Sequence, residues 1–115
     1  MNIEEFREYC LAKPATSESL PFDDKTLVFK VHKKMFTLSG IESFSSINLK
    51  CEPEYAIELR EEYDGIQPGY HMNKKHWNTV LTDGSVPDEL IYELIDHSYE
   101  LVTRGLRRKV RESLK

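Results

Sequence analysis

The sequence predicts one α+β domain in which an antiparallel sheet packs against helices. Two periodicities support this prediction. In three segments between residues 26 and 50, apolar and polar residues alternate as they do in strands, and from 90 to 106 apolar residues recur every three or four positions, as in a helix. The length of 115 residues and the hydrophobic content of 39% suit a single domain over residues 1–115. The expected order of elements is α-β-β-β-α-β-β-α.

The first helix is expected over residues 2–12. Asn2 is its candidate N-cap, because an Asn side chain accepts a hydrogen bond from the free N–H groups of a first turn. Lys13-Pro14 ends the helix, and a polar connection through Ser17 follows. The apolar residues at helical spacing, which form the buried face, are Ile3, Phe6, Tyr9 and Cys10.

Two strands between residues 26 and 40 are expected to form a hairpin. The turn between them is His32-Lys33-Lys34, which gives the hairpin a basic tip, and Ser39-Gly40 closes the second strand. A third strand is expected over 46–50, with Ile47 and Leu49 pointing inward. The apolar positions of the hairpin strands are Leu27, Val28, Phe29, Val31, Phe36 and Leu38.

A second helix is expected over residues 53–63, because Pro53 suits the first helical position and Asp64-Gly65 stops the pattern. A second hairpin follows, with a short strand over 69–72, a turn over 73–76 and a strand over 77–81. Its tip is also basic.

The last helix has the strongest periodicity of the chain. Ser85 is the candidate N-cap and Pro87 lies in the first turn. We expect this helix to pack across the sheet through an apolar stripe that contains Leu90, Ile91, Leu94, Ile95, Leu101, Val102 and Leu106.

The expected compartment is the cytoplasm. No apolar run approaches the roughly 18 residues needed to cross a bilayer, and the N-terminal residues lack the basic start and apolar stretch of a signal peptide. No membrane partner is therefore expected. Cys10 and Cys51 fit this compartment as two buried thiols rather than a disulfide.

The net charge of −4 is unevenly distributed along the chain. Residues 1–103 hold 10 Lys or Arg and 19 Asp or Glu, whereas residues 104–115 hold 6 and 1. This basic tail suits contact with phosphates, and it equally suits the negative pole of the last helix. Its members are Arg104, Arg107, Arg108, Lys109, Arg111 and Lys115.

The second hairpin resembles the signature of the MmcQ/YjbR family through the run GYHMNKKHWNTV over residues 69–80. Further matches are LPF over 20–22, KMF over 34–36, LKCEP over 49–53 and DHSYELV over 96–102. The resemblance therefore covers nearly the whole chain.

This resemblance implies a small bacterial protein with the α-β(3)-α-β(2)-α arrangement of secretion-chaperone-like folds and two wing-like hairpins, described as DNA-binding. It implies no known substrate, and no cofactor is expected. Asp23-Asp24 stands where relatives commonly have a glycine-containing turn. Two carboxylates repel the phosphate backbone, so phosphate contact near this loop is not expected.

Nucleic-acid binding needs cations to neutralise phosphates and flat groups on which bases stack. Lys33 and Lys34 add a second positive wing if both hairpins project to the same side. The alternative is structural: Tyr70, Met72 and Trp77 belong to the core, and the lysines only protect the hairpin tips. The candidates in the second hairpin are His71, Asn73, Lys74, Lys75, His76 and Trp77.

A metal site is not expected, because four His and two Cys do not occur in the paired spacing of structural zinc sites. Catalysis is not expected either, since no nucleophile with its base and no phosphate-binding glycine loop is recognisable. Cys10 lies on an apolar helix face, and Cys51 has acidic neighbours. His97 is a candidate general base, but a histidine on the surface of a helix more often has no catalytic function.

Two functions are the leading hypotheses, and a third, an enzyme acting on a small molecule, requires a pocket that combines His71, His76 and Cys51. The first is sequence-tolerant DNA binding without catalysis, through the basic hairpin tips. The second is a protein-binding adaptor, which the secretion-chaperone-like fold and the acidic overall charge favour, with sheet edges and apolar patches as the contact surface.

Overall fold

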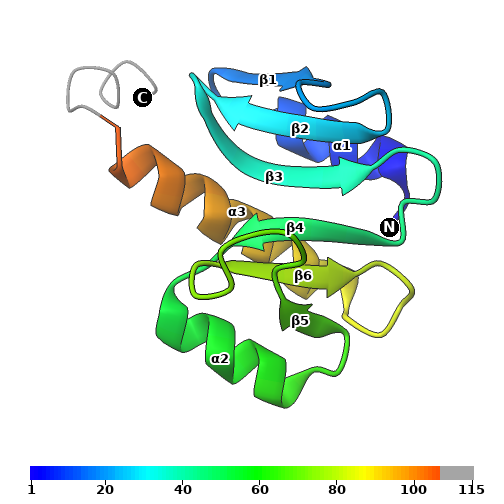
Figure 1. The fold of residues 1–115 in the computed structure, drawn as a ribbon, viewed down its shortest axis with the longest axis vertical. Helices are drawn as coiled ribbons and strands as arrows, with labels where there is room; N and C mark the ends of the chain where they lie inside the picture. The colour runs from blue at the N-terminus through cyan, green and yellow to red at the C-terminus, as the bar shows by residue number, and fades with distance from the viewer. Residues whose placement is uncertain (107–115) are drawn as a thin grey trace.

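A six-stranded sheet with the order β1-β2-β3-β4-β6-β5 forms one layer, and every neighbouring pair of strands is antiparallel (Figure 1). The computed structural model describes residues 1–106. Its helices are α1 (Ile3–Leu11), α2 (Pro53–Glu62) and α3 (Asp88–Arg104). Its strands are β1 (Thr16–Ser19), β2 (Thr26–Val31), β3 (Lys34–Gly40), β4 (Ser46–Lys50), β5 (Ile66–Pro68) and β6 (Trp77–Leu81). The predicted antiparallel α+β fold is confirmed.

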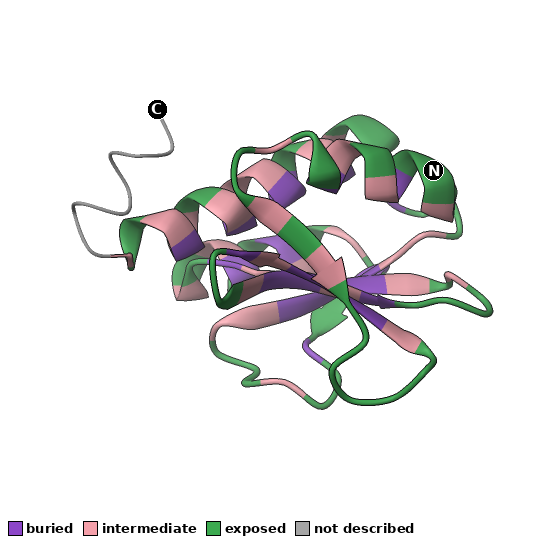
Figure 2. Cartoon of the chain, turned by 90° about the horizontal axis from the view of Figure 1, so that it is seen from above, coloured by how far each residue is buried: buried purple, intermediate pink, exposed green. Residues whose placement is uncertain are grey.

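The helices cover one face of the sheet and leave the other open (Figure 2). Strand register explains the difference, because paired residues point to the same face. One row of paired residues faces the helices and is buried: Leu27, Ser39, Ile47, Val80 and Ile66. The next row faces the open side: Val28, Leu38, Asn48, Thr79 and Gln67. The open face therefore changes from apolar on β2 and β3 to polar on β4, β6 and β5.

Helix α1 begins where the sequence predicts. Asn2 accepts a hydrogen bond from the N–H of Glu5 (2.8 Å), and the Glu5 carboxylate accepts one from the N–H of Asn2 (3.1 Å), which together form a capping box. Phe6 and Cys10 are buried on its inner face. The ring of Phe6 meets the ring of Phe29 edge to face, with 5.2 Å between centroids, so α1 packs against β2.

The segment predicted as a polar connection is instead the edge strand β1. Its sequence, TSES, has no apolar alternation, and its backbone pairs with β2 from Thr16↔Val31 to Ser19↔Val28. Arg7 of α1 also holds it, because the guanidinium Nε donates to Glu18 Oε2 over 2.8 Å and lowers the pKa of that carboxyl. Tertiary contacts, rather than local propensity, make this strand.

Two other boundaries differ from the prediction. The first strand of the second hairpin is β5 (Ile66–Pro68), and the residues predicted as that strand belong to a loop over 69–76. Pro87, not Ser85, occupies the N-cap position of α3. Ser85 instead donates its hydroxyl hydrogen to Asp83 Oδ1 over 2.6 Å in the preceding turn.

Helix α3 joins the sheet through one buried hydroxyl. Ser98 accepts a hydrogen bond from the N–H of Lys50 (3.0 Å) and donates one to the C=O of Phe36. Thr37↔Leu49 is the last paired position of β3 and β4 in this direction. The hydroxyl therefore bridges the strands one residue further on, where an extra residue in β3 has shifted the register.

Most of the predicted basic tail lies outside the described residues, namely Arg107, Arg108, Lys109, Arg111 and Lys115. Among residues 1–106, no helix has the length and apolar character needed to span a membrane.

Candidate functional site

Both basic tips lie at the same end of the sheet. The turn at His32-Lys33 leads into the start of β3, and the loop over 69–76 leads into the start of β6. Lys50, the last residue of β4, lies between these two starting points because β4 is antiparallel to both strands. The start of β3 lies beyond its pairing with β4, which ends at Thr37, so β3 curves away from β4 there (Figure 1). The sequence prediction also required both tips to project to the same side, and Lys34 does not: it pairs with Val31, a core residue, and so points to the helical side, whereas His71 and Met72 of the loop line the open face.

The 69–76 loop is held by bonds within itself. The Nζ of Lys74 donates to the C=O of Gly69 (3.2 Å), and Asn73 Oδ1 accepts from the N–H of Lys75 (2.9 Å). Gly69 has to be glycine, because a Cβ there would lie 2.8 Å from the Cβ of Trp77. His71 has φ of 58°, a left-handed conformation that is uncommon for histidine.

The predicted contact residues differ in their exposure. His76 and Trp77 are half-buried, whereas the other predicted contact residues are exposed: Lys33, Lys34, His71, Asn73, Lys74 and Lys75.

The two lysines of the first tip are not equivalent. The Nζ of Lys34 lies 3.4 Å from the C=O of Gly105, at the end of α3, where a cation complements the negative pole of the helix. Arg104 is at the same end of the molecule, and its guanidinium lies 3.7 Å from the carboxylate of Glu52. The Lys33 side chain makes no hydrogen bond or ion pair within residues 1–106.

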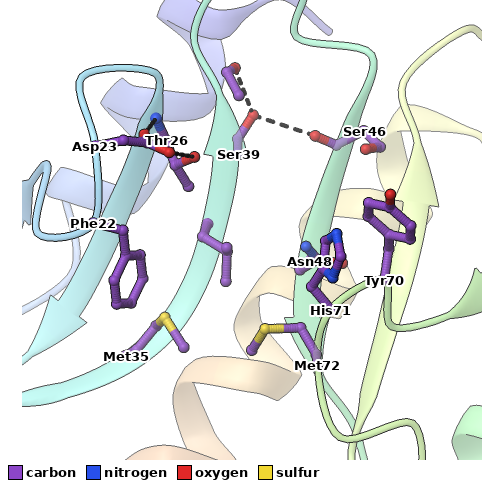
Figure 3. Close-up of a pocket in the computed structure, with 12 residues that line it drawn as sticks. Phe22, Asp23, Thr26, Met35, Ser39, Ser46, Asn48, Tyr70, His71 and Met72 are labelled. Carbon is purple, nitrogen blue, oxygen red and sulfur yellow. Dashed lines mark hydrogen bonds between the residues drawn. The ribbon is translucent and has the colours of Figure 1, made fainter.

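A groove of about 470 Å³ crosses the open face beside the 69–76 loop. Figure 3 shows Phe22 and Met35 on one side of it and Tyr70, His71 and Met72 on the other, with β3 and β4 between the two groups. Thr26, Leu38, Gly40, Ser46 and Asn48 also line it, together with Asp23 and Ser39.

The two aromatic residues of the groove are the most exposed large hydrophobic side chains of the described chain. Phe22 and Tyr70 are each 69% exposed, and neither belongs to the core cluster. Tyr70 is therefore not a core residue, contrary to the structural alternative, while Met72 and Trp77 are half-buried outside that cluster. Single exposed rings are ordinary, but two on facing walls of a groove indicate a contact surface.

Sequence reasoning missed the groove. Phe22, Met35 and Asn48 were not among the predicted contact residues. One signal was available, because Phe22 is an aromatic residue between Pro21 and Asp23-Asp24, in a segment without the periodicity that would bury it. Asn48 and Met35 join the groove only through strand register.

The acidic pair beside Phe22 has a structural role. Asp23 Oδ1 accepts hydrogen bonds from the N–H groups of Lys25 (2.9 Å) and Thr26 (2.7 Å). The Lys25 N–H, more than any other group, lowers the pKa of this carboxyl, so Asp23 stays charged at neutral pH. The Phe22 side of the groove is consequently unfavourable for phosphate.

The thiols are poor nucleophiles. Burial raises the pKa of Cys10 to about 12 and that of Cys51 to about 11, so both are protonated at neutral pH. The groove is lined by His71 but by neither His76 nor Cys51. Within residues 1–106, no cluster of three or more His, Cys, Asp and Glu is placed to bind a metal ion.

His97 caps the start of α2. Its Nε2 accepts a hydrogen bond from the N–H of Glu52 over 3.3 Å, and its ring meets the ring of Tyr55 edge to face with 5.3 Å between centroids. Burial lowers the pKa of His97, an effect that the carboxylates of Glu52 and Glu100 oppose. The neutral imidazole is therefore the form that joins α3 to α2.

Acid is expected to destabilise the protein through His97. Because its folded-state pKa is depressed, its contribution to the free energy of unfolding is complete above about pH 6.5, the unfolded value, and is lost as pH falls through the folded value. His97→Gln keeps a hydrogen-bond acceptor and does not titrate.

The measurement is urea unfolding of wild type and His97→Gln between pH 5 and 8. The difference between the two free energies should change below about pH 6.5, with wild type losing more stability. A difference that stays constant across this range would contradict the expected role of His97.

Comparison with known proteins places this fold in a family. The YjbR family model matches residues 11–101. YjbR of Escherichia coli K12 is 38% identical over 115 residues, covering 99% of this chain and 98% of the relative. YbdF of Escherichia coli O157:H7 is 36% identical over 107 residues, covering 92% and 88%. None of these names states a ligand or a reaction.

Solved structures agree. The crystal structure of a Deinococcus radiodurans protein matches with a TM-score of 0.92 and 43% identity, covering 98% of this chain and 87% of that one. A crystal structure from Pseudomonas syringae matches with a TM-score of 0.74 and 34% identity, covering 88% and 98%. The resemblance seen in the sequence is confirmed: the chain belongs to the YjbR family.

Proposed function

We propose that this protein binds nucleic acid without catalysis, through the end of the sheet where both basic tips lie. The proposal is supported by the position of both tips at the end of the sheet where β3 and β6 begin, with Lys50 of β4 between them, so Lys33, Lys34, Lys74 and Lys75 share that end. Clustered lysines neutralise phosphates and release counterions, which is the main source of sequence-tolerant affinity.

The distribution of charge between the helical layer and the sheet supports binding on the sheet side. The three helices hold twelve Asp or Glu, three Arg and no Lys, whereas the eight Lys of residues 1–106 all lie in strands and loops. Lys30 pairs with Met35, a groove residue, and therefore points to the open face. The helical face repels a polyanion, so a nucleic acid is steered to the sheet side and its basic end.

Acidic groups limit the expected affinity. Glu52 compensates Arg104, and Asp23 faces the groove at its far wall. Binding should be of moderate strength and strongly dependent on salt, as for a contact with few phosphates.

The test uses the double variant Lys74→Ala plus Lys75→Ala, with fluorescence anisotropy of a labelled oligonucleotide at several salt concentrations. We expect weaker binding to every sequence, and a plot of log K against log salt that is shallower by about 1.4 for single strands, or about 0.7 per lost phosphate contact. Lys25→Ala is the matched control, because Lys25 is exposed at the opposite end of β2.

Equal affinities and equal salt slopes for wild type and the double variant would exclude the 69–76 loop from the interface. If wild type binds neither single nor double strands at low salt, the proposal is wrong.

A protein partner is the second candidate. The backbone of β1 is paired on one side only, and Leu20 and Phe22, which follow it, are 46% and 69% exposed. An extended peptide can add to such an edge. Purified protein with no excess absorbance at 260 nm, together with absent oligonucleotide binding, would favour this function.

A further inference from the structure

The two exposed rings of the groove are placed to hold something flat. Phe22 belongs to the loop between β1 and β2, and Tyr70 to the loop between β5 and β6, so two separate loops bring them to the same groove. The Tyr70 ring also lies 4.0 Å, centroid to centroid, from the imidazole of His71. Aromatic faces of this kind are the platforms on which unpaired bases stack.

The floor between the rings offers a hydrogen-bond donor. The N–H of Tyr70 donates to Thr79 Oγ1 over 2.9 Å, and the Thr79 hydroxyl donates in turn to Asn48 Oδ1. These bonds use the acceptor side of the Asn48 amide. Its Nδ2 makes no hydrogen bond within residues 1–106 and lies on a residue that lines the groove.

The surroundings favour a base over an apolar peptide side chain. Lys74 and Lys75 are exposed in the loop that also supplies Tyr70, so phosphates on either side of a bound base would meet cations. At the Phe22 wall, Asp23 disfavours phosphate but not an uncharged heterocycle. The volume of about 470 Å³ is within the range of small-ligand sites.

We infer that the groove receives one unpaired nucleobase of a single-stranded nucleic acid. The base stacks against Tyr70, with Phe22 on the facing wall of the groove, and Asn48 Nδ2 donates to a carbonyl oxygen or ring nitrogen on its edge. This inference rests on the proposed function and adds a preference for single strands over duplexes. Bases in a duplex have both faces covered by neighbours, so single strands should bind more tightly than duplexes of equal length.

The experiment compares two single strands of equal length, one with bases and one abasic, against wild type and Tyr70→Ala. Wild type should bind the strand with bases about five- to 150-fold more tightly, the range for stacking of one base on an aromatic ring. Tyr70→Ala should lose that discrimination and keep the salt slope of wild type, because the ring contributes no charge. Phe22→Ala should behave in the same way.

Two controls separate stacking from folding and from apolar exposure. Tyr70→Phe keeps the ring and should retain discrimination. Ile57→Ala removes an apolar side chain of similar exposure (51%) from α2. It should change the affinity neither for the strand with bases nor for the abasic strand. Because Phe22 and Tyr70 are largely exposed, their alanine variants should also unfold at the same urea concentration as wild type.

The outcomes distinguish this inference from the proposed function. Equal binding of strands with and without bases, unaffected by Tyr70→Ala, would overturn the base site and leave phosphate binding by the lysines intact. Displacement of the oligonucleotide by an uncharged aromatic peptide that Tyr70→Ala no longer binds would assign the groove to a protein ligand and also overturn it. Absence of any oligonucleotide binding to wild type would contradict both the base site and the proposed function.

Discussion

Phe29→Ala is expected to lower the free energy of unfolding by about 3–5 kcal/mol, the usual cost of deleting a buried phenylalanine ring. Phe29 of β2 is fully buried and packs edge to face against Phe6 of α1. Removing the ring leaves a cavity between the two layers that neighbouring side chains fill only in part. The total free energy of unfolding of a domain of this size is only about 5–15 kcal/mol, so the loss should be evident in urea unfolding.

Phe22→Ala is the matched control for this substitution, because it removes the same side chain from an exposed position in the loop before β2. Its free energy of unfolding should lie within about 0.5 kcal/mol of wild type. A similar loss for both variants would mean that Phe22 belongs to the core, and would remove it from the candidate site.

Ser98→Ala should lower the free energy of unfolding by at least about 2 kcal/mol, a large effect for the loss of one oxygen atom. The hydroxyl satisfies the N–H of Lys50 and the C=O of Phe36 at once, and Ser98 and Phe36 are fully buried. Without the hydroxyl, two backbone groups lose a partner where water has little access, and each costs about 1–3 kcal/mol when left unsatisfied. Chemical denaturation measures the loss directly.

Thr103→Ala is the control in the same helix. The Thr103 hydroxyl donates to the C=O of Glu100 over 2.9 Å near the surface, so its removal should change stability by less than about 0.5 kcal/mol. Equal effects at the two positions would show that the Ser98 hydroxyl does not bridge β3 and β4.

Residue pattern alone predicts the parts of this fold that bury an apolar stripe. Helix α3 and strands β2, β3, β4 and β6 all have the periodicity of a half-buried element. Strand β1 has none, because its four residues are polar and its pairing with β2 supplies the stabilisation. The start of the second hairpin was misplaced for a related reason, since β5 has three residues, too few to show alternation.

The candidate site, too, could be predicted only in part from the sequence. The lysines of the two tips can be found from the sequence, because turns are local and their residues are adjacent. That the tips lie at the same end of the sheet depends on the pairing of β4 with both β3 and β6. The link from Asn48 through Thr79 to Tyr70 depends on the pairing of β4 with β6. Strand order and register are non-local, so no single segment of the sequence contains them.

The most direct test of nucleic-acid binding at this surface is an NMR titration of the isotope-labelled protein with a short single-stranded oligonucleotide at low salt. We predict saturable shifts of backbone amides in the 69–76 loop, at His32-Lys33, and at Asn48 and Thr79 on the open face. Amides on the outer surface of α2 should stay unchanged. A spectrum without shifts, or with shifts confined to the helical layer, would contradict the proposed interface.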